Sequence, residues 1–142
     1  MQTTDRTPVS EQPVNELQIK GAIEPVIERY FATMNAQEYR QTAALFASDG
    51  IMHPPFESDI VGLEAIANYL EAEAPGMQLH PKEGKLEENS DRTYRITGKV
   101  KTPLFSVNVA WTFILNQSQQ IQNVTIKLLA SPQELLKLRS PN

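Results

Sequence analysis

The sequence predicts a single α+β domain with helices first and a curved antiparallel sheet after them. Apolar residues recur at the three-to-four spacing of helices in the first half of the chain, and this spacing changes to the alternation of strands beyond residue 76. The chain has 142 residues, which is enough for one domain with its own core. Helices followed by a run of strands are typical of an α+β fold in which the helices cover the concave side of the sheet.

Composition excludes several classes of function. The net charge is −4 and there is no basic run, so nucleic acid is not expected as a partner. The chain has no cysteine, which excludes disulfides and thiolate metal sites, and its two histidines are too few for a histidine-rich metal centre. The N-terminus lacks the features of a signal peptide, and no apolar run approaches the ~20 residues of a membrane span. We therefore expect a cytoplasmic protein without a bound metal.

The N-terminal part of the chain predicts a lead-in and a first helix. Residues 1–17 are mostly polar, so we expect a flexible segment there and a single folded domain over residues 18–142. An apolar stripe of helical spacing runs over Ile19–Met34. Pro25 lies inside this stripe and either kinks the helix or stands in its first turn.

Two more helices and a short strand are expected before the sheet. The second helix covers residues 36–46 and is ended by the turn residues Ser48-Asp49-Gly50. Ile51-Met52-His53 is a short strand, and Gly62 precedes a third helix over residues 63–74 that Pro75-Gly76 ends.

The remainder of the chain predicts four or five strands and a short C-terminal helix. Alternating residues and intervening turns place the strands at 77–81, 85–88, 92–102, 105–116 and 120–129. Ser131-Pro132-Gln133-Glu134 has the features of a helix start within the tail 131–142. This order of elements resembles the cone-shaped domain of nuclear transport factor 2 and ketosteroid isomerase relatives, with three N-terminal helices packed on the sheet.

A cone of this kind encloses an apolar cavity, which is the natural place for a ligand or a catalytic group. Acid–base enzymes with this fold place an aspartate or an Asp–His pair there, and the candidates are Asp49, His53, Asp59 and Asp91. Asp49 is explained by an Asx turn, and the late strands carry no carboxylate. We therefore predict no catalytic residue, while a small isomerase- or hydratase-type enzyme and a non-catalytic interaction module remain as alternatives.

Tyr30 and Trp111 are the polar groups best placed to contact a ligand in such a cavity. Tyr30 lies on the first apolar stripe, and Trp111 shares a strand face with Val109 and Phe113. Each is a large apolar body with one hydrogen-bond donor, and such donors find an acceptor when they are buried. Either each donor bonds a backbone carbonyl in an ordinary core, or both meet one acceptor atom of an otherwise apolar ligand.

Several runs of the sequence carry a family resemblance. They are residues 30–36, 45–50, 54–56, 60–62, 97–103, 108–113 and 128–136, of which Asn-Val-Ala-Trp and Leu-Leu-Ala-Ser-Pro-Gln-Glu-Leu-Leu are the most specific. In order and spacing these runs resemble the C-terminal domain of the cyanobacterial orange carotenoid proteins. The resemblance covers about residues 20–139 and makes the chain similar to the C-terminal domain homologs of that family.

The resemblance implies a carrier of a ketocarotenoid of the canthaxanthin or echinenone type. In that family a tyrosine and a tryptophan donate hydrogen bonds to the keto oxygen, and Tyr30 and Trp111 stand at the matching positions. The resemblance also implies a tunnel lining, which we expect to face inward: Met34, Val61, Met77, Leu79, Phe105 and Ile126. The family's roles in photoprotection and singlet-oxygen quenching follow as expectations.

The expected partners follow from the same resemblance and from size. A compact domain of this length has a radius of gyration of about 14–15 Å, so it covers roughly half of a two-ringed polyene. We therefore expect a homodimer in the loaded state. Helical carotenoid proteins or apo orange carotenoid protein are the expected transfer partners, with membrane contact for pigment uptake and residues 133–139 as a gate.

Overall fold

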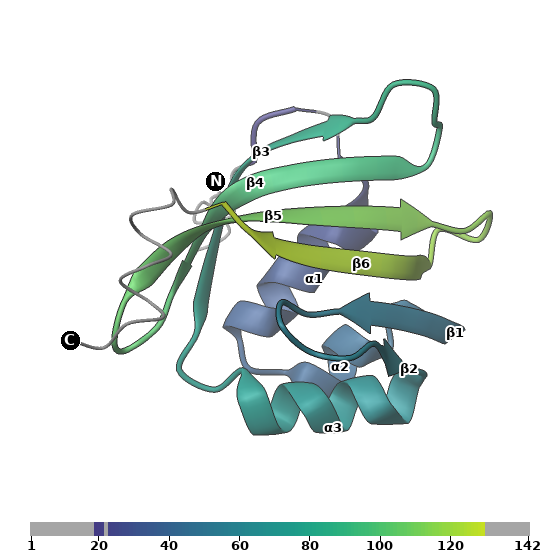
Figure 1. The fold of residues 1–142 in the computed structure, drawn as a ribbon. Helices are drawn as coiled ribbons and strands as arrows, with labels where there is room; N and C mark the ends of the chain where they lie inside the picture. The colour runs from purple at the N-terminus through teal and green to yellow at the C-terminus, as the bar shows by residue number, and fades with distance from the viewer. Residues whose placement is uncertain (1–18, 22, 130–142) are drawn as a thin grey trace, which may run out of the picture.

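A curved sheet of six strands forms one side of the molecule, and helices cover its inner face (Figure 1). The computed structural model describes residues 19–21 and 23–129. The predicted α+β class is confirmed. The elements are α1 (Pro25–Asn35), α2 (Tyr39–Ala43), β1 (Phe46–His53), β2 (Ile60–Val61), α3 (Leu63–Glu73), β3 (Gln78–Leu86), β4 (Thr93–Lys101), β5 (Ser106–Leu115) and β6 (Ile121–Leu128).

The strands lie in the order β2-β1-β6-β5-β4-β3. All neighbours are antiparallel except β1 and β6, which run parallel, so the sheet is mixed rather than wholly antiparallel. Strands β3 to β6 follow one another through tight connections, which fixes the direction of β6, whereas β1 reaches it from the helical half of the chain. In Figure 1 the first helix crosses behind β5 and β6, and α3 lies beside β1 and β2.

Helix α1 begins at Pro25, which confirms the second of the two roles considered for this proline. A proline in the first turn loses no helical hydrogen bond, because that N–H has no partner within the helix. The preceding residues are extended instead of helical: Lys20 N–H donates to Lys82 O (2.9 Å), and Gly84 N–H donates to Lys20 O (2.8 Å). Gly21 has φ +106° and approaches Gly84 so closely that a side chain would not fit.

The prediction for residues 36–50 is partly wrong. Helix α2 has five residues, and β1 already begins at Phe46. Ser48-Asp49-Gly50 lies within β1 and does not end a helix. The register between β1 and β6 shifts between Phe46 and Ile51, so these turn-forming residues occupy an irregular part of the strand. Pairing with β6, a contact distant in sequence, overrides the local preference.

Two strands predicted separately form one. β3 runs through Gln78–Leu86, with a register shift between Pro81 and Glu83. Proline is tolerated there because β3 is an edge strand and needs no N–H donor on its open side. The two-residue strand β2 was not predicted. The lead-in 1–17, the C-terminal helix and the proposed gate lie outside the described residues.

The core lies between the inner face of the sheet and the apolar faces of α1 and α3. None of the helices among the described residues is long and apolar enough to span a bilayer. The largest fully buried side chains are Trp111, Tyr30, Phe31, Phe46, Phe113, Ile27, Met52, Ile66, Ile96, Ile121, Val109 and Val124.

Asn35 joins the end of α1 to the edge strand β3. Its Nδ2 donates to Leu79 O (2.8 Å), and its Oδ1 accepts from Leu79 N–H (2.8 Å). The side chain therefore occupies the place that a neighbouring strand would take. We expect Asn35→Ala to lower the free energy of unfolding by about 1–3 kcal/mol, measured by urea denaturation, because two hydrogen bonds are lost. Glu28→Ala, at an exposed site of α1, is the control, and equal effects of the two changes would contradict this role.

Candidate ligand-binding site

Tyr30 projects from α1 into the aromatic centre of the core. Its exposed fraction is 1%. The ring makes edge-to-face contacts with Phe31 and Phe113, with ring centroids 5.2 Å and 5.0 Å away. Because these neighbours come from α1 and β5, the tyrosine is fixed between helix and sheet.

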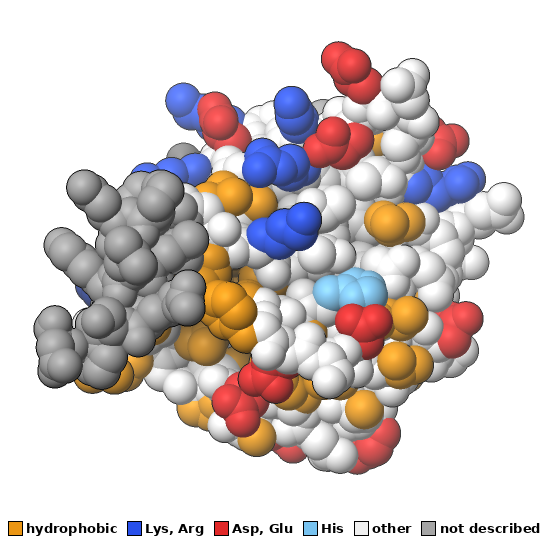
Figure 2. Space-filling model, viewed as in Figure 1, with side chains coloured by type: hydrophobic (Ala, Val, Ile, Leu, Met, Phe, Trp, Pro, Cys, Tyr) orange, Lys and Arg blue, Asp and Glu red, His pale blue; other side chains and the backbone are white. Residues whose placement is uncertain are grey.

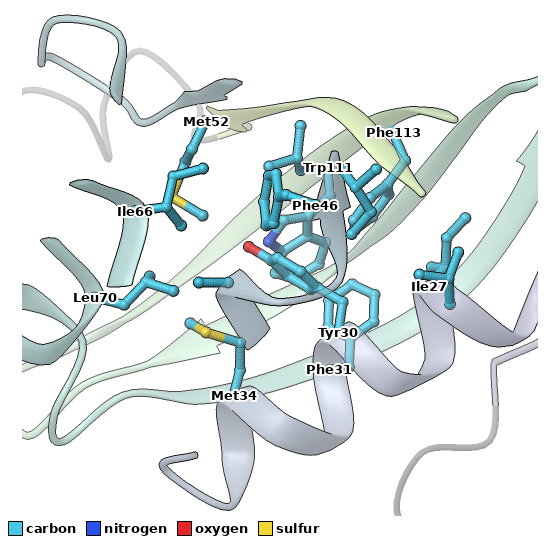
Figure 3. Close-up of a cluster of buried hydrophobic side chains, with 14 of the residues drawn as sticks. Ile27, Tyr30, Phe31, Met34, Phe46, Met52, Ile66, Leu70, Trp111 and Phe113 are labelled. Atoms are coloured by element: carbon cyan, nitrogen blue, oxygen red, sulfur yellow. The ribbon is translucent and has the colours of Figure 1, made fainter. Parts of the chain in front are cut away.

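Trp111 lies on the inner face of β5, where it pairs with Ile96 of β4 and Ile126 of β6. It is also 1% exposed. Phe31 packs edge-to-face on the indole, with the ring centroids 4.8 Å apart. Phe31 therefore contacts both Tyr30 and Trp111. In Figure 3 the hydroxyl oxygen of Tyr30 and the indole nitrogen of Trp111 point into the same region of the cluster.

Several other polar groups in and around the core are paired with one another. Thr42 Oγ1, for example, lies 2.6 Å from Thr33 Oγ1, and Tyr94 Oη donates to Glu24 Oε2 (3.0 Å). The hydrogen bonds that the described residues make to one another include none from Tyr30 Oη or Trp111 Nε1. Among the described residues neither donor bonds a backbone carbonyl, and the buried side-chain atoms without any hydrogen-bond partner are Tyr39 Oη and Asn123 Oδ1.

Burial also fixes the protonation state of the tyrosine. Removal from water raises the pKa of Tyr30 well above its ordinary value of about 10, and nearby Tyr69 raises it further. The hydroxyl is therefore protonated at neutral pH and keeps its donor. A carbonyl oxygen, which only accepts, is the complementary ligand group.

The structure places the six predicted lining residues in three settings. Met34 and Leu79 are buried, and Met77 and Ile126 are half-buried against the core. The remaining two are Val61 and Phe105, which are 57% and 45% exposed.

The expectation that all six face inward is therefore wrong for Val61 and Phe105. Val61 belongs to the short edge strand β2, and Phe105 stands in the turn before β5. In these places no element of the described part of the chain covers the side chain, although the sequence pattern around each is apolar.

An apolar line connects the turn before β5 with the tryptophan. Val107, Val109 and Trp111 share the inner face of β5, and Phe105 precedes them at the same two-residue spacing. At ~3.4 Å per residue the line is about 20 Å long. It leads from a partly exposed side chain to a fully buried one. Alternation in the sequence indicated this face, but Val107 and Val109 were not predicted as site residues.

Two hollows on the described surface lie away from this line. One of about 360 Å³ is bordered by Lys20, Glu83, Lys85 and Arg95, and one of about 690 Å³ by Lys82, Asn108 and Leu129 among others. Neither borders Tyr30 or Trp111, whose surroundings are filled by Phe31, Phe46 and Phe113. Within the described core the two donors are enclosed by aromatic side chains.

The candidate catalytic residues do not lie beside Tyr30 and Trp111. His53 Nδ1 lies 2.7 Å from Asp59 Oδ1, and the register of β1 with β6 pairs His53 with Thr125, on the outer face of the sheet. Asp49 is exposed and accepts from Gln122 Nε2 (3.0 Å).

Asp91 is exposed beside Arg92. In the described part of the chain Thr42 is the one buried polar side chain apart from tyrosine and tryptophan, and no three His, Asp or Glu side chains gather as they would around a metal. An acid–base pair directed at Tyr30 and Trp111 is therefore not part of the described core.

Comparison with known proteins gives the family. The model of the nuclear transport factor 2 (NTF2) domain matches residues 23–125. The chain is 37% identical over 129 residues to the orange carotenoid-binding protein of Limnospira maxima, covering 87% of this chain and 41% of that protein. It thus spans about two fifths of the length of this curated relative.

Solved structures agree. The canthaxanthin-binding orange carotenoid protein of Anabaena (Nostoc) superposes with a TM-score of 0.76 at 37% identity, covering 86% of this chain and 41% of that one. A putative ketosteroid isomerase from Kribbella flavida has a TM-score of 0.64 at 18% identity, with 75% and 76% covered, and shares the fold alone. The predicted resemblance is confirmed: the chain belongs to the nuclear transport factor 2 domain family and is similar to part of the orange carotenoid-binding proteins.

Proposed function

We propose that this chain is a non-catalytic carrier that binds a ketocarotenoid of the canthaxanthin or echinenone type. The observation that carries the proposal is the pair Tyr30 and Trp111, two buried hydrogen-bond donors that pack on the same phenylalanine, Phe31, in an apolar centre. Identity of 37% to orange carotenoid-binding proteins supplies the chemical class of the ligand.

The geometry suits an apolar rod with one carbonyl near its end. Burial of the rod along the line from Phe105 to Trp111 would contribute about 25 cal/mol per Å² of apolar surface. The keto oxygen would accept from Tyr30 Oη and Trp111 Nε1, which fixes the orientation of the rod. A hydrocarbon ring would leave both donors without an acceptor and would bind more weakly.

Binding requires the inner side chains to move. Tyr30 and Trp111 are packed against phenylalanines, so the polyene must separate part of α1 from the sheet. Met34 is the most adaptable neighbour, since an unbranched thioether side chain changes shape at low cost. A carrier benefits from this arrangement, because closure of the core after release favours delivery of the pigment.

An enzyme of the isomerase type is less well supported. Such a reaction needs an acid or base beside the substrate. His53 and Asp59 contact each other on the outer face of the sheet, and Asp49 and Asp91 are exposed. An interaction module without a ligand would not require two donors in an apolar centre. We therefore favour a binding role that contributes to photoprotection and singlet-oxygen quenching in the cytoplasm.

Co-expression in bacteria that synthesise carotenoids tests the proposal. We expect a coloured protein from cells that make canthaxanthin and a much paler one from cells that make only β-carotene, which has no keto group. Pigment-to-protein ratios from absorbance give the comparison. A colourless protein from both strains would contradict the proposal. Equal loading in both strains would show that the keto group does not contribute to binding.

We predict that the loaded protein is a homodimer with one carotenoid for two chains. The line from Phe105 to Trp111 accommodates only part of a long polyene, and the exposed remainder would be unfavourable in water. Two copies joined at their open ends would cover it under a two-fold axis. Light scattering with the pigment ratio measures both quantities, and a loaded monomer with one carotenoid would contradict this prediction.

Transfer would then proceed from the dimer to helical carotenoid proteins or to apo orange carotenoid protein. Separation of the two copies exposes the pigment, so dilution of the loaded dimer with such an acceptor should move the absorbance to the acceptor. This direction of transfer is part of the proposal and rests on the family resemblance.

A further inference from the structure

The turn between β4 and β5 presents two apolar residues to solvent. Leu104 is 88% exposed and Phe105 is 45% exposed, and they follow each other in the chain. The turn stands at the open end of the line that leads to Trp111. The large apolar side chains on the inner face of β5 are buried or half-buried, so the exposure of Leu104 and Phe105 is a local exception at the end of that face.

Hydrogen bonds within the turn keep Leu104 and Phe105 in this exposed position. The hydroxyl of Thr102 accepts from Leu104 N–H (3.2 Å) and Phe105 N–H (3.1 Å), and it lies 3.0 Å from Phe105 O. Thr102 N–H also donates to Phe105 O (2.8 Å). These bonds close the turn and direct Leu104 away from the core. On the other side of the turn, Pro103 rests against Gly76.

Two lysines lie next to the turn, on the outer face of the sheet. Lys99 and Lys101 are exposed on β4 and stand opposite Asn108 and Ser106 of β5, so neither faces an acid across the strands. The salt bridges among the described residues do not include them. Figure 2 shows Lys and Arg side chains spread over this face, close to apolar side chains.

The acids of α3 lie away from this outer face. Glu71 and Glu73 are exposed in the last turns of α3, the helix that ends just before Gly76, and Glu71 Oε2 is paired with Arg40 Nε (3.3 Å). Helix α3 packs on α2, β1 and β2, so its carboxylates are not neighbours of Lys99 and Lys101. A negatively charged surface would therefore approach the turn from the side of β4 and β5.

We propose that this turn docks on an anionic phospholipid bilayer, with Leu104 in the interfacial layer and Lys99 and Lys101 over the headgroup phosphates. An exposed apolar side chain flanked by lysines is the combination that binds such surfaces reversibly. The inference rests on the proposed function, because the docked turn would open the line from Phe105 to Trp111 toward the phase in which an apolar pigment dissolves.

A fluorescent reporter tests the contact directly. The chain has one tryptophan, Trp111, which is buried, so Leu104→Trp adds an exposed reporter at the turn. We expect its emission to shift to the blue with vesicles of phosphatidylcholine and phosphatidylglycerol, and the shift to weaken with added salt. Ile114→Trp, at an exposed site on the opposite end of β5, is the matched reporter and should not shift.

Co-sedimentation with the same vesicles measures the energetic contribution. We expect Leu104→Ser to weaken binding of the pigment-free protein on the order of tenfold, and Lys99→Gln with Lys101→Gln to abolish the preference for phosphatidylglycerol. Ile114→Ser should leave binding unchanged. An equal loss in Ile114→Ser and Leu104→Ser, or no binding by the unmodified protein, would overturn the inference.

Two further measurements distinguish bilayer docking from self-association and from pigment binding. If Leu104→Ser reduces self-association in light scattering but leaves vesicle binding intact, the turn contacts a second copy and the inference is wrong. Pigment offered in detergent tests the carrier function without a bilayer. Uptake from detergent with no vesicle binding overturns the docking proposal alone, whereas vesicle binding without pigment uptake overturns the carrier function alone.

Discussion

Replacing both Tyr30 and Trp111 by phenylalanine is expected to weaken binding of a diketo pigment by roughly five- to a hundredfold. Each change removes one donor and retains an aromatic ring. A hydrogen bond of this kind contributes about 0.5–1.5 kcal/mol net, so two donors contribute about 1–3 kcal/mol. Since every 1.4 kcal/mol is about tenfold in affinity, the double change gives the stated range.

The absorption spectrum should change with the affinity. Hydrogen bonds to the keto oxygen stabilise charge displaced toward it on excitation, so loss of both donors should move the absorption of the bound pigment to the blue. Titration with canthaxanthin and with β-carotene, followed by absorbance, measures affinity and colour together. β-Carotene is the control, because it has no keto group and loss of the two donors should not weaken its binding. An unaltered canthaxanthin spectrum in the double variant would exclude the two donors as the anchor.

Phe31→Ala should produce the largest loss of stability among changes at this site. Phe31 is fully buried and packs edge-to-face on Tyr30, Trp111 and Phe113, with ring centroids 5.2, 4.8 and 5.9 Å away. Truncation leaves a cavity between α1 and β5, and such changes cost about 3–5 kcal/mol. Urea denaturation followed by Trp111 fluorescence measures the free energy of unfolding.

Phe31→Leu provides the matched comparison. Leucine fills most of the space but lacks the edge-to-face contacts, so we expect a loss below that of alanine, at about 1–2 kcal/mol. We also expect the Phe31→Ala variant to bind canthaxanthin with lower affinity, because Phe31 positions the donors of Tyr30 and Trp111. A stable Phe31→Ala variant with normal binding would contradict this positioning role.

The burial of the two central residues of the candidate site could be predicted from the sequence because both residues obey simple periodicities. Tyr30 follows the helical spacing of α1, and Trp111 follows the two-residue alternation of β5, so each could be assigned to an inner face without a structure. Their shared contact with Phe31 could not be predicted, because it depends on where α1 crosses the sheet.

The periphery was less predictable, for a physical reason. Val61 and Phe105 are apolar residues that no second element among residues 19–21 and 23–129 covers. Hydrophobicity alone does not show whether a neighbouring element will cover a side chain. Ser48-Asp49-Gly50 has strong turn preferences, but pairing of β1 with β6 draws it into a strand. Pairing between strands about 70 residues apart leaves no local pattern, so the parallel β1–β6 contact and the mixed sheet were not apparent.

A solved structure of the canthaxanthin-loaded protein tests the central claim most directly. The quantity to measure is the distance from the keto oxygen of the buried ring to Tyr30 Oη and to Trp111 Nε1. The account predicts that both distances are hydrogen-bond lengths, about 2.7–3.2 Å. A keto oxygen bonded to other groups, or exposed to water while Tyr30 and Trp111 remain packed on the phenylalanines, would contradict it.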